Sequence, residues 1–470
     1  MNDRIPVRAV ETLDPRRPVR LTPAQAGGPI HTRGFRGRFR NLRLLGAGAL
    51  MLLFFATAWL NWNGRQAVLW DLQGRQFHIF GATFWPQDFV LLSALLIICA
   101  FGLFAITVFA GRVWCGYACP QSVWTWMFMW AEKVSEGDRG QRLKLDAAPW
   151  SAAKLARRTA KHGLWLGIAL ATAVTFVGYF MPIRPLLADL AGLRLDSASA
   201  FWVAFFTAAT YLNAGWLREK VCRDMCPYSR FQSVMFDRDT LAIAYDATRG
   251  EPRGARRKDS DAQAQGLGDC VDCTLCVQVC PTGIDIRDGL QLECIGCAAC
   301  IDACDSVMDK LGYARGLVRY GSEAELAGER TRLLRPRLVG YAAALLLMIG
   351  AFAWALAARP LVSLDVTRDR GLFRENAAGQ IENIYSLKVI NKTQAPQRYL
   401  IALTDSDGLA LQGPGELRLA AGEIRDVPVS VARLVEDGKG SARPLYFEVV
   451  PLDAPEGRVV TDSTFIAPAR

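Results

Sequence analysis

The chain contains five long stretches without Asp, Glu, Lys or Arg, and each is long enough to cross a bilayer. A membrane-spanning helix needs about 20 predominantly apolar residues. A charge at the centre of such a helix costs ~2.5–3.5 kcal/mol, so five clean runs predict five transmembrane helices rather than the core of a soluble protein. The stretches are rich in Leu, Ala, Phe and Trp and cover residues 44–64, 89–111, 162–183, 197–217 and 338–358.

A sixth charge-free run, residues 113–131, differs from these five because it contains two cysteines and a proline. It is also rich in tryptophan, a residue that gathers at membrane–water interfaces. We interpret this run as an interfacial or re-entrant helix rather than as a further span.

The distribution of basic residues predicts the orientation of the chain. Lys and Arg number 10 before the first span, 9 in residues 112–161 and 18 in residues 218–337, but only 2 each in residues 65–88 and 184–196. Basic loops mark the cytoplasmic side of a membrane. The N-terminus and the two strongly basic segments are therefore expected in the cytoplasm, and residues 359–470 outside.

Composition narrows the range of functions. The net charge is +10, but residues 359–470 hold 14 basic and 15 acidic residues, so the excess lies on the segments predicted to be cytoplasmic. Topology thus accounts for the charge, and nucleic acid is not an expected partner. The chain has only 3 His and no Cys-x-x-Cys-His motif, which excludes a c-type haem and argues against a bis-His haem in the membrane.

Eight of the 13 cysteines form two tandem runs with the spacing of a two-cluster bacterial ferredoxin, in which the last Cys of each run binds the other cluster. Zinc sites use looser spacing, and disulfides are rare in a reducing cytoplasm. We therefore predict two [4Fe–4S] clusters. The runs are Cys270-x2-Cys273-x2-Cys276-x3-Cys280-Pro281 and Cys294-x2-Cys297-x2-Cys300-x3-Cys304-Asp305. Cluster one is assigned to Cys270, Cys273, Cys276 and Cys304, and cluster two to Cys294, Cys297, Cys300 and Cys280.

Four further cysteines form a repeated motif, each copy of which follows a predicted span at the same membrane face. Helical spacing of three to four residues places both sulfurs of a copy on one side. If the two spans are neighbours, four thiols meet, and soft thiolates suit Cu(I) or a third iron–sulfur cluster. Two unrelated pairs of reduced thiols are the alternative. The copies are Cys115-x3-Cys119-Pro120 and Cys222-x3-Cys226-Pro227, and the remaining Cys99 is expected to be a packing residue.

The last part of the chain changes character. Short runs of alternating hydrophobic and polar residues, such as Ile384–Ile390 and Val427–Val431, are separated by turn signals such as Gly413-Pro414. About seven such strands over ~110 residues predict an immunoglobulin-like β-sandwich, which we interpret as an interaction module.

The predicted fold is therefore a multi-domain membrane protein. We expect a disordered cytoplasmic N-terminus (1–40), a four-helix membrane region with both Cys-x3-Cys-Pro motifs (41–230) and a cytoplasmic ferredoxin domain with two clusters (231–336). A fifth transmembrane helix (337–359) and the β-sandwich (360–470) follow.

With these motifs in hand, the sequence resembles the cytochrome c oxidase accessory proteins of the FixG/CcoG/RdxA type. The resemblance extends over about residues 35–470, and the ferredoxin segment is its most specific part. It implies a role in assembly of cbb3-type cytochrome c oxidase, as a cupric reductase that supplies Cu(I). The matching segments are Trp114-Cys-Gly-Tyr-Ala-Cys-Pro-Gln121, Cys222-x3-Cys226-Pro-Tyr228, Asp269–Ile284 and Glu293–Asp305.

The same resemblance implies the location and partners. The protein is expected in the bacterial inner membrane, with a cytoplasmic ferredoxin domain, a periplasmic sandwich and catalytic thiols in the Cys-x3-Cys-Pro motifs. Copper ions, and either oxidase subunits or copper chaperones and transporters, are the expected partners. One alternative is a quinol-oxidising polyferredoxin like those that feed nitrate or nitrous oxide reductases, against which the fifth span and the sandwich argue. A non-catalytic assembly scaffold is another, against which twelve intact cysteine ligands argue.

Overall fold

The computed structural model describes residues 30–256, 266–371, 373–377, 379–404, 408–434 and 441–468. These residues divide into two compact units. The first unit contains the described residues up to Leu53, together with those of Ala100–Ala173 and Ala198–Ala344. The second contains Phe54–Cys99, Val174–Ser197 and the described residues from Leu345 onward. Both predicted ferredoxin runs and both Cys-x3-Cys-Pro motifs belong to the first unit.

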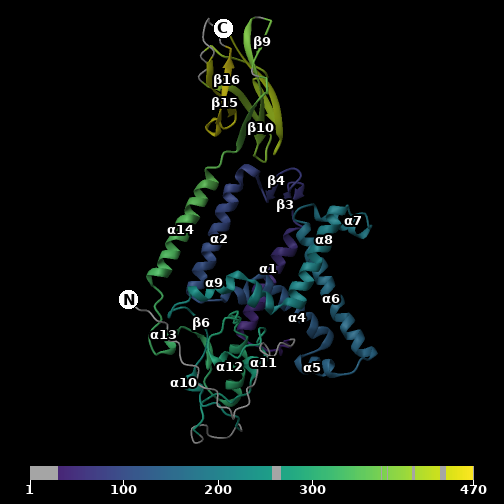
Figure 1. Cartoon of the computed structure of the whole chain (residues 1–470), viewed down its shortest axis with the longest axis vertical. Coiled ribbons are helices and arrows are strands. Elements are labelled where there is room, and N and C mark those ends of the chain that lie inside the picture. The colour runs from purple at the N-terminus through teal and green to yellow at the C-terminus, as the bar shows by residue number, and fades with distance from the viewer. Residues whose placement is uncertain are drawn as a thin grey trace. The chain divides into compact units, whose positions relative to one another are not determined.

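Four helices of the described residues are long and apolar enough to cross a membrane (Figure 1). The most apolar parts of two of them, α2 and α14, bury nothing against the rest of the protein, as expected for helices that face lipid. The chain is thus built as a membrane protein. The four helices are α1 (Arg38–Thr57), α2 (Phe89–Ala110, after a 3-10 turn at Pro86–Asp88), α6 (Ala152–Val177) and α14 (Pro336–Ala357).

The predicted spans differ from these helices in extent and number. The first span was predicted to reach residue 64, but α1 ends at Thr57. The chain then forms a hairpin between β1 (Asn61–Trp62) and β2 (Arg65–Gln66), in which Asn63 and Gly64 have positive φ. The third was predicted over 162–183, but α6 begins ten residues earlier and ends at Val177. The ends of the charge-free stretches therefore do not coincide with the ends of the helices.

The fourth predicted span, residues 197–217, is helical but is not among the four helices long and apolar enough to cross. It consists of the 14-residue helix α8 (Ser197–Thr210) followed by the π-helical segment η2 (Tyr211–Leu217). The α-helical part is shorter than the ~20 residues that a straight span requires. A π-helical segment η3 (Val221–Met225) and helix α9 (Pro227–Met235) follow.

The predicted interfacial run is divided at its second cysteine. Helix α3 (Val113–Tyr117) ends before Cys119, and α4 (Pro120–Glu136) begins after it with proline in its first turn. Proline is favoured there because the first amides of a helix have no partner within the helix. Helix α5 (Arg139–Ala147) comes next.

The ferredoxin segment forms the rest of the first unit. Strand β6 (Ala242–Tyr245) pairs antiparallel with β7 (Val318–Gly321), and the helices α11 (Leu275–Gln278) and α12 (Ala299–Leu311) are in contact (Figure 1). Ile243, Ile286, Ile301, Met308 and Leu317 are buried among these elements. Short elements complete the segment: α10 (Ala247–Gly250), the 3-10 turn Ile286–Asp288 and α13 (Glu323–Leu326).

The N-terminal segment was predicted to be disordered over residues 1–40. Residues 1–29 lie outside the described part of the chain, but the remainder packs on the ferredoxin segment. The amide of Arg33 donates to the Gln278 carbonyl oxygen (2.8 Å), and the amides of Phe39 and Arg40 donate to the Asp302 carboxylate (3.1 and 2.7 Å). Because Asp302 satisfies amides of the first turn of α1, the predicted disorder does not extend over residues 30–40.

The second unit contains a small sheet that the hydrophobic pattern did not reveal. Strands β3 (Val68–Asp71), β4 (Gln76–Ile79) and β5 (Ala82–Phe84) pair in that order, and helix α7 (Ile183–Ala191) belongs to the same unit.

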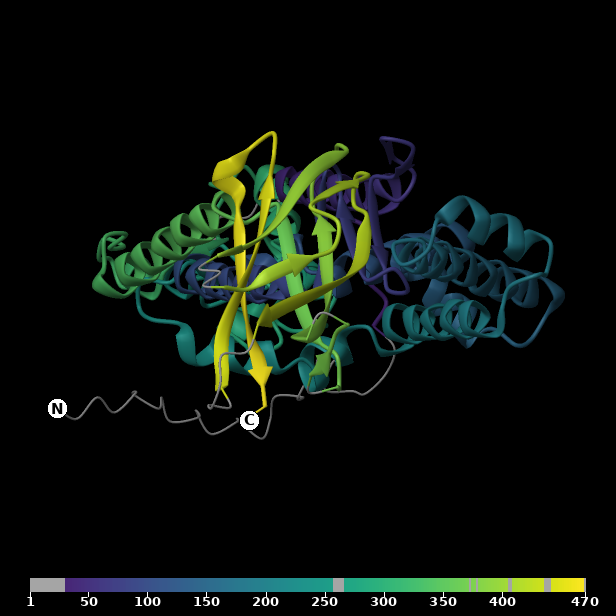
Figure 2. The same ribbon diagram turned by 90° about the horizontal axis from the view of Figure 1, so that it is seen from above.

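The C-terminal part of the second unit is the predicted β-sandwich. One sheet has the order β12-β14-β10-β8, with β9 paired to β10, and the other has the order β13-β11-β15-β16 (Figures 1 and 2). Tyr385, Phe447 and Phe465 are among its fully buried side chains. The strands are β8 (Val362–Arg368), β9 (Arg374–Glu375), β10 (Gln380–Asn391), β11 (Gln397–Thr404), β12 (Ala410–Gln412), β13 (Glu416–Leu419), β14 (Ile424–Leu434), β15 (Ser441–Pro451) and β16 (Val459–Ala467).

Candidate metal centre

Two small cavities in the ferredoxin segment are lined by cysteines from both runs. Each receives three cysteines from one run and the last cysteine of the other, which is the crossed arrangement of a two-cluster ferredoxin. The first cavity is lined by Cys270, Cys273, Cys276 and Cys304, and the second by Cys280, Cys294, Cys297 and Cys300, with Cys276 at its edge.

Both runs reach this arrangement through the same backbone turn. The residue before the second cysteine has positive φ in each run, Asp272 at 51° and Gly296 at 66°. The residue after it does too, since Thr274 and Ala298 both have φ of 57°. A left-handed residue other than glycine costs about 1–2 kcal/mol. Strain repeated at equivalent positions indicates loops shaped to present thiols to a bound group rather than to pack well.

Burial keeps these thiols protonated in the absence of metal. It raises the pKa of Cys276, Cys294 and Cys304 to about 12 each, and it also raises that of Cys280 and Cys300. A bound cation must supply the charge that draws the protons off. Four such thiols around each cavity are the donor set of an iron–sulfur cluster.

The donors form two sets of four cysteines, as two clusters require. Among the described residues, no group of three or more His, Cys, Asp or Glu side chains is placed to hold one metal ion. The thiolates of a four-iron cluster stand at the corners of a cubane, farther apart than those around zinc.

The two Cys-x3-Cys-Pro motifs share one local structure. The first cysteine of each lies in a short helical segment, α3 for Cys115 and η3 for Cys222. The second, Cys119 or Cys226, has extended backbone and is the N-cap of the next helix, with proline in the first turn. The N-terminus of a helix carries partial positive charge, which favours a thiolate.

The two motifs lie close to each other, since Cys222 is within electrostatic reach of the other three motif cysteines. Burial raises the pKa of Cys115 to about 11, and the charges of Cys119 and Cys226 add to the increase. Burial also raises the pKa of Cys222 to about 12, with further contributions from Cys119, Cys115 and Cys226. Helix α4 is tied to the second motif by Gln121, whose side-chain amide donates to the Asn213 (2.9 Å) and Arg218 (3.3 Å) carbonyl oxygens.

This four-cysteine site packs directly against the second run. A Cβ atom on Gly116 would lie 2.8 Å from Cys297 Cα, and one on Gly296 would lie 2.9 Å from the Arg112 carbonyl carbon. Neither position has room for a side chain, so α3 and the second run meet backbone to backbone. Cys115 and Cys222 pack against the buried cluster that contains Cys297.

Arg112 also stabilises the contact between α3 and the second run. Its guanidinium is buried and donates to the carbonyl oxygens of Leu292 and Cys294 in the second run. It also donates to the carbonyl oxygen of Ser229 in α9, just after the second motif. One side chain thus joins both motifs to the second run.

Gln232 of α9 faces the four-cysteine site. Its side chain is fully buried, and its Oε1 accepts a hydrogen bond from Cys115 Sγ at 3.7 Å. Its Nε2 has no hydrogen-bond partner among the described residues. A buried unpaired amide is costly, so this donor is available to a thiolate or to a group bound by the thiols. Gln232 and Arg112 lie outside the predicted motifs, and Gly116 lies within one but was not expected to have a role of its own. The only signal was the closeness of each to a motif cysteine.

Comparison with known proteins identifies the family. A family model of a 4Fe-4S dicluster domain matches residues 217–323, and one of a 4Fe-4S binding domain matches residues 92–131. A third, the Ig-like fold at the C-terminus of FixG, matches residues 352–468.

The chain is similar over most of its length to three curated proteins. It is 38% identical over 433 residues to nitrogen fixation protein FixG of Rhizobium meliloti, which covers 84% of the chain and 82% of FixG. It is 39% identical over 422 residues to RdxA of Cereibacter sphaeroides (86% of each chain) and 39% identical over 402 residues to RdxB of the same organism (82% of this chain, 84% of RdxB).

The chain belongs to the FixG/RdxA family. Together with the apolar helices, this membership makes it a membrane iron–sulfur protein with a redox function, and it confirms the resemblance and the C-terminal Ig-like domain. The family models also confirm [4Fe–4S] clusters as cofactors.

The crossed ligand assignment predicts the effect of replacing Cys280. Although Cys280 belongs to the first run, Cys280→Ser is expected to damage the cluster held mainly by the second run. The electron paramagnetic resonance spectrum of the reduced variant should therefore match that of Cys294→Ser and not that of Cys270→Ser. Cys99→Ser, outside every motif, is the control and should leave the spectrum unchanged. A Cys280→Ser spectrum like that of Cys270→Ser would refute the assignment.

Proposed function

We propose that this protein is a cupric reductase that converts Cu(II) to Cu(I) at the four-cysteine site, for assembly of a cbb3-type cytochrome c oxidase. The observation that supports this most strongly is the backbone contact between Gly116 and the second cysteine run. It brings a half-buried group of thiols next to the cavity that fits a cluster.

The chemistry requires a single electron for each copper ion. Reduced clusters held by the two four-cysteine sets would supply one electron for each Cu(II). Thiolates bind Cu(I) strongly and bind Cu(II) poorly, which raises the potential of copper held by Cys115, Cys119, Cys222 and Cys226. Reduction at this site is therefore favourable, and Cu(I) is released to copper chaperones, transporters or oxidase subunits.

Two neighbouring residues help these cysteines. The positive charge of Arg112 lowers the cost of ionising the buried Cys115 and Cys222 thiols. The amide of Gln232, by rotation about its side chain, can donate to the Cys115 thiolate in place of accepting from its thiol.

A second candidate for the four-cysteine site is a third [4Fe–4S] cluster. It is favoured by the match of a 4Fe-4S binding domain to residues 92–131, a segment that contains Cys115 and Cys119 but neither ferredoxin run. The site would then relay electrons, as in a quinol-oxidising polyferredoxin, and copper would not bind the thiols directly.

Metal analysis of anaerobically purified protein, with a copper assay, tests the proposal. We expect about eight iron atoms per chain from two clusters. The dithionite-reduced protein, freed of excess reductant, should form Cu(I) from Cu(II) in proportion to its reduced clusters, detected with a Cu(I)-specific chelator. About twelve iron atoms per chain would support the third cluster instead, and failure to reduce Cu(II) would overturn the proposal.

We also propose that residues 218–337 face the cytoplasm and the β-sandwich faces the periplasm. This orientation requires the segment α8–η2 to cross the membrane as a fifth span, because four spans would leave both termini on one side. Alkaline phosphatase fused after residue 360 should be active, and fused near residue 255 it should be inactive. Activity at residue 255 with inactivity at residue 360 would overturn the orientation and mean that α8–η2 does not cross, and inactivity at both positions would mean that α14 does not cross.

A further inference from the structure

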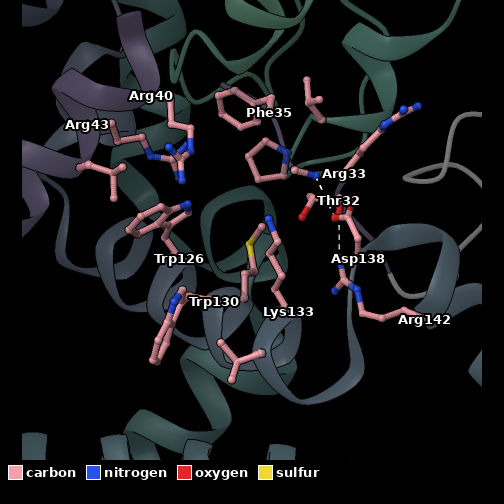
Figure 3. Close-up of a pocket in the computed structure, with 16 residues that line it drawn as sticks. Thr32, Arg33, Phe35, Arg40, Arg43, Trp126, Trp130, Lys133, Asp138 and Arg142 are labelled. Atoms are coloured by element: carbon pink, nitrogen blue, oxygen red, sulfur yellow. Dashed lines mark hydrogen bonds between the residues drawn. The ribbon is translucent and has the colours of Figure 1, made fainter. Parts of the chain in front are cut away.

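A third, larger cavity of about 500 Å³ lies beside the end of the first cysteine run, within the first unit (Figure 3). It is bounded by residues before and at the start of α1, by one face of α4, and by Val279 and Pro281 next to Cys280. No step of the proposed copper chemistry uses it. Its lining is apolar and aromatic on α4, from Trp126 to Val134, and basic at both ends.

The charges of this cavity do not balance. Five basic side chains line it, against the single carboxylate of Asp138. Asp138 accepts a hydrogen bond from the amide of Gly34 (3.1 Å). Arg142 is paired with Glu132 (2.8 Å), which lies outside the lining, and donates to the carbonyl oxygen of Thr32 (2.7 Å). Glu132 thus balances Arg142, and Asp138 is the single carboxylate that lines the cavity against the other four cations.

Four of the five cations have no carboxylate partner among the described residues, and Arg33 donates instead to the Gln278 side-chain oxygen (3.4 Å). Within the described residues, no carboxylate lies at ion-pair distance from Arg40, Arg43 or Lys133. Arg43 is only 7% exposed. Its guanidinium makes a cation–π contact with Trp126, 5.9 Å from the centre of the ring. Figure 3 shows the guanidinium groups of Arg40 and Arg43 close to each other beside Trp126, with Lys133 extending toward the same space.

An anion is needed to explain this arrangement. A buried cation is costly unless it is paired, and two like charges held together increase that cost. Guanidinium groups match the oxygens of a phosphate with parallel hydrogen bonds, and two of them with an ammonium group suit a phosphate better than a single carboxylate.

The surroundings indicate an amphipathic anion. Helix α1 is one of the four helices that can span a membrane, and Arg40 and Arg43 lie in its first two turns. Large apolar side chains next to the cavity are exposed, including Leu45 (75%) on α1 and Trp130 (55%) on α4. A ligand with a phosphate in the cavity and hydrocarbon chains along α1 would cover both features. Basic pockets at the cytoplasmic ends of spanning helices bind anionic lipid headgroups in this way.

We propose that this cavity binds the phosphate of an anionic phospholipid headgroup. The inference is independent of the reaction proposed for the four-cysteine site. Because Pro281 lines the cavity, a bound lipid would also hold the end of the first run against α1 and α4.

The test uses the full-length protein with its clusters, in nanodiscs of neutral phosphatidylcholine doped with phosphatidylglycerol or cardiolipin. Native mass spectrometry measures the lipid that is retained. Arg40→Gln/Arg43→Gln should weaken retention of the anionic lipid by about a hundredfold, roughly tenfold for each charged hydrogen-bonding group removed. The matched control is Arg36→Gln/Arg38→Gln, which removes the same charge from exposed residues outside the cavity and should change retention less than twofold.

Single variants and soluble phosphate ligands distinguish a lipid site from the alternatives. Arg40→Gln and Lys133→Gln alone affect less buried residues, and iron content shows whether each variant is folded. An equal loss of lipid retention in Arg36→Gln/Arg38→Gln would show that anionic lipid is held only by nonspecific attraction to positive charge, and it would overturn the proposal. Binding of inorganic phosphate or a soluble phosphate ester in place of the lipid, lost in the same variants, would overturn the lipid and identify a soluble ligand for the cavity.

Discussion

Gly116→Ala is expected to uncouple the four-cysteine site from the ferredoxin segment. The new methyl group would lie 2.8 Å from Cys297 Cα and from the Gly296 carbonyl oxygen. Both neighbours are backbone atoms, so no flexible side chain can move aside, and α3 must separate from the second run. Overpacking of this kind costs about 1–3 kcal/mol. Gly296→Ala should cost more, because residue 296 has φ of 66° and a left-handed alanine adds about 1–2 kcal/mol.

The expected readout is slow copper reduction by a protein that keeps its iron. Gly116 lies outside both ferredoxin runs, so Gly116→Ala should retain about eight iron atoms. Its rate of Cu(II) reduction should fall by on the order of ten- to hundredfold, because the site has moved from the position that receives electrons. Gly140→Ala in α5 is the matched control, since a Cβ atom there meets nothing within 4 Å. A wild-type rate in Gly116→Ala would show that the contact is unimportant for electron transfer.

Features fixed by short stretches of sequence could be predicted. The spacing within each cysteine run led to two cavities with crossed cysteine sets, because the same loop turn recurs in both runs. The alternating run Ile384–Ile390 falls within β10, and Val427–Val431 within β14, because a half-buried strand imposes its own period of two.

Features that depend on contacts between distant segments could not be predicted. The contacts of Arg112 with Leu292 and Ser229 join residues more than 100 positions apart, and nothing in the local sequence indicates them. The end of α1 at Thr57 was missed because a charge-free sequence can still turn where Asn and Gly accept positive φ. Order in residues 30–40 was missed because its cause, capping by Asp302, lies far along the chain.

Replacing either cysteine pair of the four-cysteine site should nearly abolish copper reduction. Residues that act as one unit have strongly non-additive effects, so either pair alone should cost about as much as both. We expect Cys115→Ser/Cys119→Ser and Cys222→Ser/Cys226→Ser each to lower the rate by roughly two orders of magnitude or more. Cys99→Ser should have no effect. Full activity in one pair variant would show that the other pair suffices.

The central claim is that the four cysteines pass electrons to copper, and the quadruple Cys→Ser variant tests it most directly. The decisive measurement is the anaerobic rate of Cu(I) formation by the dithionite-reduced variant, made together with its iron content. The account predicts a background rate with about eight iron atoms still bound. A wild-type rate with that iron in place would contradict it, and a loss of about four iron atoms relative to the wild type would assign the site to a third cluster.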